Sequence, residues 1–193
     1  MYFSSARGVG LAGIWLLTGP PGVGKSTALS KVVLRLKSAG VIVGGFTTSE
    51  QRSGGTRIGF AIGDLTTGRS GQLASASARV GPRVGRYRVN LEDLAKIGAA
   101  GLDAAAERSE LIVIDEVGPM ELVSPEFRRA VKKCVESAKP LLAVVHERLD
   151  DDILNELRSK ATSVFSMTVE TRDQIVEELG TILLDAVGGT KLR

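Results

Sequence analysis

Short apolar runs alternate along this chain with segments whose apolar residues recur at helical spacing. The runs predict buried strands at residues 13–18, 41–46, 111–114, 141–145 and 164–169. The helical spacing and the capping residues predict helices at residues 25–38, 90–107, 124–137, 153–160 and 172–187. Because strands that alternate with helices build β-α-β units, we expect an α/β fold of three layers, with a mainly parallel central sheet and helices on both faces.

A glycine-rich stretch interrupts this alternation in the first half of the chain. Residues 47–73 favour β structure and contain the turn Thr66-Thr67-Gly68, which predicts antiparallel hairpins attached to the edge of the parallel sheet. Residues 74–88 show little apolar periodicity and are predicted to form a loop. We expect one domain over residues 1–193, with flexible ends at residues 1–10 and 188–193.

The composition excludes several classes of protein. The chain has 193 residues, of which 43% are hydrophobic, so it is long enough to bury a core without a metal or a disulfide. Cys134 is the only cysteine and His146 the only histidine, which excludes an internal disulfide and a cysteine-based metal cluster. No apolar run approaches the ~20 residues that cross a bilayer, and no secretory leader is evident, so we expect a cytoplasmic monomer.

Positive charge is concentrated in one segment. Residues 51–90 contain seven arginines and one acid, Asp64, although the formal net charge of the chain is only +3. Arg83 and Arg86 lie in a glycine-flanked loop and could neutralise a phosphoryl group, or they could simply be solvated. Nucleic acid is a third possible partner for this segment, but no recognisable nucleic-acid-binding module accompanies the charge.

The most specific motif follows the first predicted strand and opens the first predicted helix. It has the pattern G-x-x-x-x-G-K-[ST] of a phosphate-binding loop, or P-loop, and consists of Gly19, Pro20, Pro21, Gly22, Val23, Gly24, Lys25, Ser26 and Thr27. Glycines allow backbone N–H groups to point at a phosphate, and the helix N-terminus adds positive potential. Lys25 can bind the β- and γ-phosphates, while the Ser26 hydroxyl can bind Mg²⁺.

A second motif places two acids at the end of the predicted strand 111–114. Because the P-loop and the strand end meet at one edge of a parallel sheet, Asp115 is predicted to hold the Mg²⁺ through a water, and Glu116 to polarise an attacking water. Lys25, Glu116, Arg83 and Arg86 are therefore the candidate catalytic residues. His146, which follows another strand, either contacts the γ-phosphate or the water, or bonds to the backbone. Glu121 could orient the metal site.

The order of several segments resembles the small thermostable P-loop nucleoside-triphosphatase family, which includes a cancer-related nucleoside-triphosphatase. The resemblance runs from about Ile14 to Val187, and its most distinctive segments are Gly-Pro-Arg-Val-Gly-Arg-Tyr at residues 81–87 and Asp-Glu-Val-Gly-Pro-Met-Glu-Leu at residues 115–122. It implies a P-loop fold and Mg²⁺-dependent hydrolysis of nucleoside triphosphates to diphosphate and phosphate.

Weak discrimination among bases is expected as well. The chain contains no Asn-Lys-x-Asp guanine-binding motif and few aromatic residues, so ATP, GTP, CTP, UTP and TTP are all candidate substrates. Two alternatives remain open. One is a nucleotide or small-molecule kinase that uses the same P-loop, and the other is a nucleotide-dependent switch associated with nucleic acid.

Overall fold

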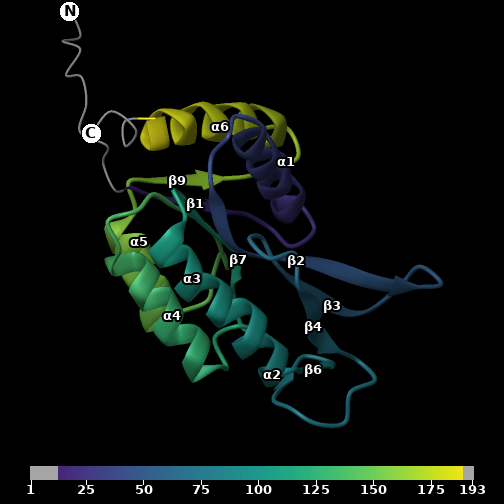
Figure 1. Cartoon of the computed structure of the whole chain (residues 1–193). Coiled ribbons are helices and arrows are strands. Elements are labelled where there is room, and N and C mark those ends of the chain that lie inside the picture. Colours follow the sequence, from purple (N-terminus) through teal and green to yellow (C-terminus); the bar gives the residue numbers. More distant parts are fainter. Residues whose placement is uncertain (1–12, 189–193) are drawn as a thin grey trace, which may run out of the picture.

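A mixed sheet forms the centre of the computed structural model, which describes residues 13–188 (Figure 1). Within that range nine strands join it: β1 Ile14–Thr18, β2 Val43–Ser53, β3 Thr56–Asp64, β4 Ser70–Ser75, β5 Arg83–Val84, β6 Tyr87–Val89, β7 Leu111–Val117, β8 Leu141–Val145 and β9 Ser163–Ser166. Their order across the sheet is β5-β6-β4-β3-β2-β7-β8-β1-β9.

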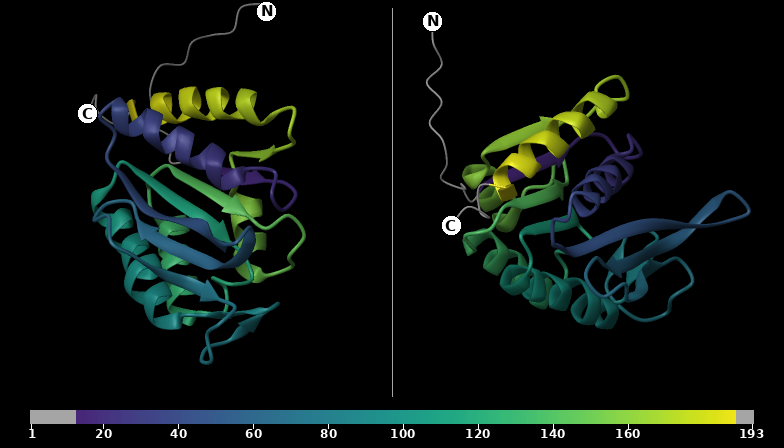
Figure 2. Two further views of the ribbon diagram at one scale, coloured as in Figure 1. Left: turned by 90° about the vertical axis from the view of Figure 1, so that its right-hand side faces the viewer. Right: turned by 45° about the horizontal axis from the view of Figure 1, so that its top comes forward.

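The sheet has a parallel half and an antiparallel half, as predicted. Strands β2, β7, β8, β1 and β9 are parallel, whereas β3, β4, β6 and β5 continue the sheet as antiparallel strands. β2 belongs to both halves, because its first residues pair with β7 and the residues from Phe46 onward pair with β3. The β2–β3 hairpin consequently extends beyond the rest of the sheet (Figure 2).

Helices cover both faces of the parallel half, which confirms the α/β prediction (Figure 1). The helical segments are α1 Lys25–Ser38, α2 Leu91–Asp93, the π-helix η1 Leu94–Ala99, α3 Ala100–Arg108, α4 Pro125–Glu136, α5 Asp152–Lys160 and α6 Arg172–Gly188. α1 and α6 pack on one face, where they bury Trp15 and Leu17 of β1. η1, α3, α4 and α5 pack on the other, where they bury Leu16. Consecutive residues of β1 thus enter opposite cores.

Capping residues explain where several helices begin. The side chains of Asn90, Ser124 and Asp151 accept hydrogen bonds from the backbone N–H groups of Asp93, Phe127 and Ile153, respectively. Such a bond satisfies one of the N–H groups that the first helical turn leaves without a partner, and contributes about 1 kcal/mol. The predicted helix starts near residues 90 and 124 are therefore confirmed.

The prediction of a loop at residues 74–88 was wrong in part. β4 continues to Ser75, and β5 and β6 form a short hairpin that turns at Gly85, where φ is +58°. Pairing of Ala74 with Val89 adds this hairpin to the sheet, so tertiary pairing replaces the missing periodicity. The last strand ends at Ser166 rather than residue 169, and a π-helix interrupts the helix predicted at residues 90–107.

Two expectations concern the chain ends and the membrane. The predicted flexible ends, residues 1–10 and 188–193, lie outside the described residues except for Gly188, the last residue of α6. Among residues 13–188, no helix is long and apolar enough to cross a membrane. Cys134 is buried on α4 and packs in the core, as its helical position predicts.

Candidate active site

The P-loop connects β1 to α1 and is built on left-handed glycines. Gly19, Gly22 and Gly24 have φ values of +147°, +78° and +101°, which side chains disfavour. A Cβ at Gly19 would stand 2.5 Å from the backbone oxygen of Met167, whereas no atom lies within 4 Å of a Cβ placed at Gly22 or Gly24. The loop is therefore packed against the protein at its start and open at its centre, where a ligand could approach.

Lys25 crosses this loop from the first turn of α1. Its Nζ donates to the carbonyl oxygens of Gly19 at 2.8 Å and of Pro20 at 3.2 Å. An ammonium has three N–H groups, so one remains for a ligand in this arrangement. The N-terminus of α1 carries no acidic residue in its first turn, and its positive dipole end adds to the charge of Lys25.

Asp115 links the P-loop to the end of β7. Ser26 Oγ donates to Asp115 Oδ1 at 3.0 Å, and the Thr48 N–H of β2 donates to Oδ2 at 3.2 Å. The carboxyl group is inaccessible to solvent, and this burial raises its pKa to about 6, although the two hydrogen bonds and the charge of Lys25 act in the opposite direction. The structure thus brings together the two motifs that the sequence predicted to meet.

Glu116, the next residue, lies in the same crevice and is less buried than Asp115. The peptide bond between the two acids is cis. Burial raises the pKa of Glu116, while the positive charge of Lys25, and that of His146 when it is protonated, lower it. Glu116 therefore lies within electrostatic reach of both Lys25 and His146.

Glu121 adds a third carboxyl group near Asp115 and Glu116, and from the sequence we expected only that it could orient the metal site. The side chain is 4% exposed, and Glu121 Oε2 accepts a hydrogen bond from the Gly118 N–H at 3.1 Å. Burial, with the nearby charges of Glu116 and Asp115, raises its pKa to about 8. A Cβ at Gly118 would lie 3.2 Å from Glu121 Oε2 and 3.4 Å from Glu116 Oε1, so this glycine lets both acids approach.

His146 follows β8, the strand between β7 and β1. The backbone N–H of His146 donates to the Val117 carbonyl at 3.2 Å, which places the residue beside the end of β7. Its Nδ1 accepts the backbone N–H groups of Arg148 at 3.3 Å and Leu149 at 3.0 Å. The predicted bonding of this histidine to the backbone is therefore observed.

Arg83 and Arg86 are placed away from the P-loop. They belong to the β5–β6 hairpin at one edge of the sheet, and β4, β3, β2, β7 and β8 stand between β6 and β1. Arg83 Nε donates to the Gly85 carbonyl at 2.9 Å, and Arg86 Nη2 donates to the Arg57 carbonyl. In this arrangement their bonds hold the antiparallel half of the sheet.

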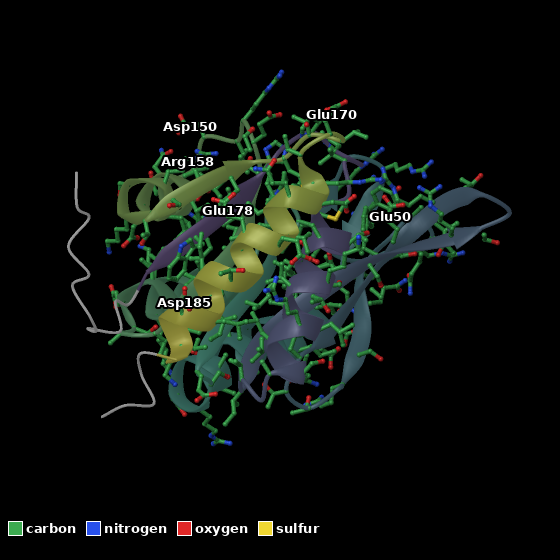
Figure 3. The ribbon with its side chains drawn as sticks, turned by 90° about the horizontal axis from the view of Figure 1, so that it is seen from above. Glu50, Asp150, Arg158, Glu170, Glu178 and Asp185 are labelled. Carbon is green, nitrogen blue, oxygen red and sulfur yellow. The ribbon has the colours of Figure 1, made fainter. Side chains whose placement is uncertain are left out.

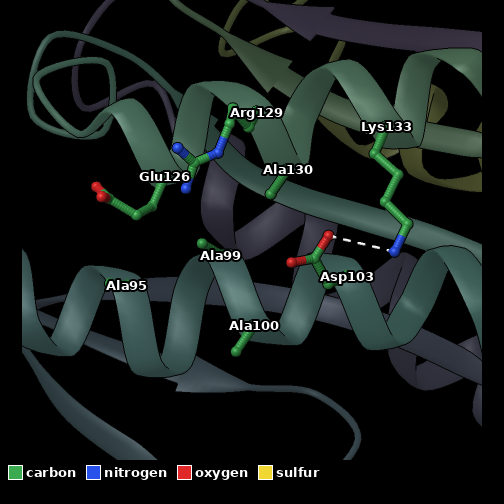
Figure 4. A pocket seen from close by; sticks show the side chains of 8 residues that line it. All are labelled: Ala95, Ala99, Ala100, Asp103, Glu126, Arg129, Ala130 and Lys133. Carbon is green, nitrogen blue, oxygen red and sulfur yellow. Dashed lines mark ion pairs between the residues drawn. The ribbon is translucent and has the colours of Figure 1, made fainter.

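A separate hollow lies between two neighbouring helical segments of one layer, away from these motifs. It has a volume of about 310 Å³ between η1–α3 and α4, with Ala99 and Ala130 facing each other across it (Figure 4). Lys133 and Asp103 form an ion pair of 3.5 Å at one side. None of the candidate site residues lines it.

Comparison with known proteins places this chain in a family. A family model described as NTPase matches residues 15–180. The nucleoside-triphosphatase THEP1 of Thermofilum pendens is 44% identical over 167 residues, covering 86% of this chain and 92% of that protein. THEP1 of Methanosarcina acetivorans is 42% identical and covers 89% of this chain and 97% of its own.

Solved structures agree with the sequence relatives. The crystal structure of THEP1 from Aquifex aeolicus superimposes with a TM-score of 0.79 at 30% identity, covering 88% of this chain and 98% of that one. The solution structure of a human cancer-related nucleoside triphosphatase gives a TM-score of 0.75 at 34% identity, covering 89% and 97%. The chain therefore belongs to the NTPase family and has the fold of its P-loop nucleoside-triphosphatases.

Proposed function

We propose that this protein hydrolyses nucleoside triphosphates to nucleoside diphosphate and phosphate with the help of Mg²⁺. The observation that carries the proposal is the 3.0 Å hydrogen bond from Ser26 Oγ to Asp115 Oδ1. It joins the loop suited to a polyphosphate with the strand end that carries the acids, although 89 positions separate the two residues in the chain. The names of the relatives, nucleoside-triphosphatases, support the same reaction.

In this proposal the P-loop binds the phosphates mainly through its backbone. The backbone N–H groups of residues 22–27 surround the β-phosphate, because Pro20 and Pro21 carry none, and the N-terminus of α1 stabilises its negative charge. Lys25 is already held beside the loop by Gly19 and Pro20, so it needs little reorganisation to reach the β- and γ-phosphate oxygens. Such preorganised positive groups stabilise charge that develops in the transition state.

The chemistry of Ser26 and Asp115 fits Mg²⁺. Both offer oxygen atoms, and the part of the chain that the structure describes contains no cluster of three or more His, Cys, Asp or Glu arranged to hold a metal. Two oxygen ligands suit an ion that takes its other ligands from water and from substrate phosphates, as Mg²⁺ does. When bound there, Mg²⁺ would neutralise the phosphate oxygens and bring the triphosphate to the loop.

Glu116 is the proposed group that orients the attacking water. The water oxygen forms a bond to the γ-phosphorus while the bond from that phosphorus to the β–γ bridging oxygen breaks, and the nucleoside diphosphate leaves. The water proton passes to the Glu116 carboxylate or to the departing phosphate. Burial raises the pKa of Glu116, which favours proton uptake, and the charge of Lys25 opposes this rise and so helps keep the carboxylate ionised before the reaction.

Broad use of ATP, GTP, CTP, UTP and TTP follows from where the binding groups lie, since all of those named above contact phosphates rather than a base. We also expect the protein to work as a monomer in the cytoplasm. The charge-neutralising role predicted for Arg83 and Arg86 requires the β5–β6 hairpin to approach the P-loop. If they act so, Arg83→Ala or Arg86→Ala lowers kcat by about 10³-fold, as for an arginine finger, and unchanged kcat in both excludes the role.

The experiment is phosphate release from ATP and GTP with and without Mg²⁺. We expect Glu116→Gln to lower kcat by about 10²- to 10⁴-fold while nucleotide binding persists, and Lys25→Ala to weaken binding. Glu178→Gln, an exposed change on α6, is the control (Figure 3). Full activity of Glu116→Gln would refute its role. Transfer of γ-labelled phosphate to a nucleoside monophosphate in preference to water would show a kinase instead, and strong acceleration by RNA would show a nucleic-acid-dependent switch.

A further inference from the structure

His146 occupies a position between the two motifs of the proposed site. β8 lies between β7 and β1, and Val144 pairs with Leu17 of β1. Two residues further along both parallel strands, His146 is level with Gly19, the first residue of the P-loop. On the other side, the backbone N–H of His146 donates to the carbonyl oxygen of Val117, the last residue of β7. This strand also carries Asp115 and Glu116.

The turn after β8 holds the imidazole from one side. Nδ1 accepts two backbone N–H groups, those of Arg148 and Leu149. Arg158 of α5 fixes this turn in place, because its guanidinium donates to the carbonyl oxygens of His146 at 2.9 Å and Leu149 at 3.2 Å (Figure 3). The half-buried ring is therefore anchored in a formed turn.

These two bonds determine which nitrogen carries the proton. A proton on Nδ1 would point at two N–H donors, so Nδ1 must present its lone pair and the neutral ring must carry its proton on Nε2. Nε2 is then a donor without an available lone pair. A general base at this position would need the opposite tautomer, and would place two N–H groups against an N–H.

We propose that His146 binds the γ-phosphate as a fixed hydrogen-bond donor, through Nε2–H, and thereby distinguishes nucleoside triphosphate from diphosphate. The inference rests on the proposed function and adds to it a contact that only the terminal phosphate receives. His146 follows the strand next to β1, level with the start of the P-loop, and both Lys25 and His146 act electrostatically on Glu116, so the three residues surround the place expected for a γ-phosphoryl group. The same tautomer leaves Glu116 as the acceptor for the water proton.

Nuclear magnetic resonance can test the tautomer directly, because His146 is the only histidine of the chain. A ¹⁵N-labelled sample gives one pair of ring nitrogen signals, and we expect an unprotonated Nδ1 and a protonated Nε2 in the free protein. Adding Mg²⁺ with the β,γ-imido analogue of ATP should shift the Nε2–H signal, whereas Mg²⁺ with ADP should leave it nearly unchanged. A proton on Nδ1, or equal shifts with both nucleotides, would overturn the proposal.

Two substitutions separate the donor from the turn. The amide oxygen of His146→Asn can replace Nδ1 as the acceptor but cannot reach the phosphate, whereas the longer side chain of His146→Gln can place an N–H near the Nε2 position. We expect His146→Asn to bind the imido analogue roughly tenfold to hundredfold more weakly, the loss of a hydrogen bond to a charged group, with ADP binding unchanged. His146→Gln should recover part of that affinity.

Arg148→Ala is the matched control, because it removes a neighbouring exposed cation and keeps the backbone N–H that bonds to Nδ1. It should retain the full preference for the analogue. Equal losses for ADP and the analogue in His146→Asn would assign a purely structural role to the ring. If the wild type hydrolyses ATP and His146→Asn keeps the full preference for the analogue over ADP, this inference alone is refuted. If the wild type binds neither nucleotide, the proposed function is refuted.

Discussion

The buried carboxyl group of Glu121 should make the stability of this protein depend on pH in a way that one substitution removes. In the folded protein its pKa is raised from 4.5 to about 8, mainly by burial. The folded state therefore binds the proton more tightly than the unfolded state does. The stabilisation from neutral Glu121 is fully present below the unfolded pKa and is lost as the pH rises through the folded pKa.

The size of the effect follows from the same two values. Each pKa unit corresponds to 1.36 kcal/mol, so a shift from 4.5 to about 8 corresponds to about 5 kcal/mol lost between these pH values. Glutamine has nearly the same shape and does not ionise, and its amide oxygen can still accept the Gly118 N–H. The free energy of unfolding of Glu121→Gln, relative to that of the wild type, should therefore rise by about 1.4 kcal/mol per pH unit over this range. Above this range the difference should stay constant.

Urea unfolding from about pH 5 to about pH 9, without nucleotide or Mg²⁺, measures this difference. Asp115 and Glu116 also have raised pKa values, and their charges act on Glu121, so the difference between the two proteins reports the titration of Glu121 together with its coupling to these two acids. Glu178→Gln removes an exposed carboxyl group and should follow the wild type at every pH. A difference between Glu121→Gln and wild type that stays constant across the range would refute the reasoning, because a buried carboxyl with a raised pKa must produce a slope.

Three further predictions concern the strand ends and the turn beside them. Gly45→Ala should lower the free energy of unfolding by about 3 kcal/mol, because φ is +111° and the new Cβ would overlap the Val113 carbonyl. Gly40→Ala, where φ is +80° and the space around the new Cβ is open, should lower it by only about 1 kcal/mol. Equal losses of the two variants in urea unfolding would contradict this reasoning. Gly118→Ala should lower kcat by about 10²-fold with little loss of nucleotide affinity, because its Cβ would contact the carboxyl oxygens of Glu121 and Glu116 at 3.2 and 3.4 Å. An unchanged kcat would show that these carboxyl groups can shift freely. kcat/KM should fall as the pH drops through about 6, where Asp115 takes up a proton. The pH midpoint of this fall should move lower as the Mg²⁺ concentration rises, because the cation and the proton compete for the Asp115 carboxylate. A pH midpoint independent of Mg²⁺ would assign the titration to another group.

Features that depend on neighbouring residues could be predicted from the sequence. The apolar periods gave the parallel strands and the main helices, and the caps at Asn90 and Ser124 gave two helix starts. The meeting of Ser26 with Asp115 followed as well, since it needs only the rule that carboxyl ends of parallel strands share one edge. Local chemistry and one topological rule were sufficient to predict that the P-loop and the acids of β7 meet.

Features that depend on distant packing could not be predicted. The β5–β6 hairpin has too few residues for a periodic pattern and exists because β4 offers it an edge to pair with. The burial of Glu121 depends on the turn at Gly118, which brings a carboxyl from the next turn back beneath Glu116. Strand order across the sheet, which separates Arg83 and Arg86 from the P-loop, is not encoded in the order of strands along the chain.

The arginine-rich segment shows why charge in a sequence window is a weak guide to a binding site. Arg57 donates to Glu50 at 2.5 Å and to the Tyr87 hydroxyl at 3.0 Å, and its guanidinium lies 5.2 Å from the centre of the Phe60 ring. Glu50 precedes the window, so a count over residues 51–90 misses the acid that lowers the free charge of this region. Arg57, Arg83 and Arg86 thus all bond to strands and turns of the antiparallel half of the sheet. In the proposed function, affinity for a polyphosphate comes instead from the backbone of the P-loop and from Lys25, because geometry rather than the number of cations decides where an anion is stabilised.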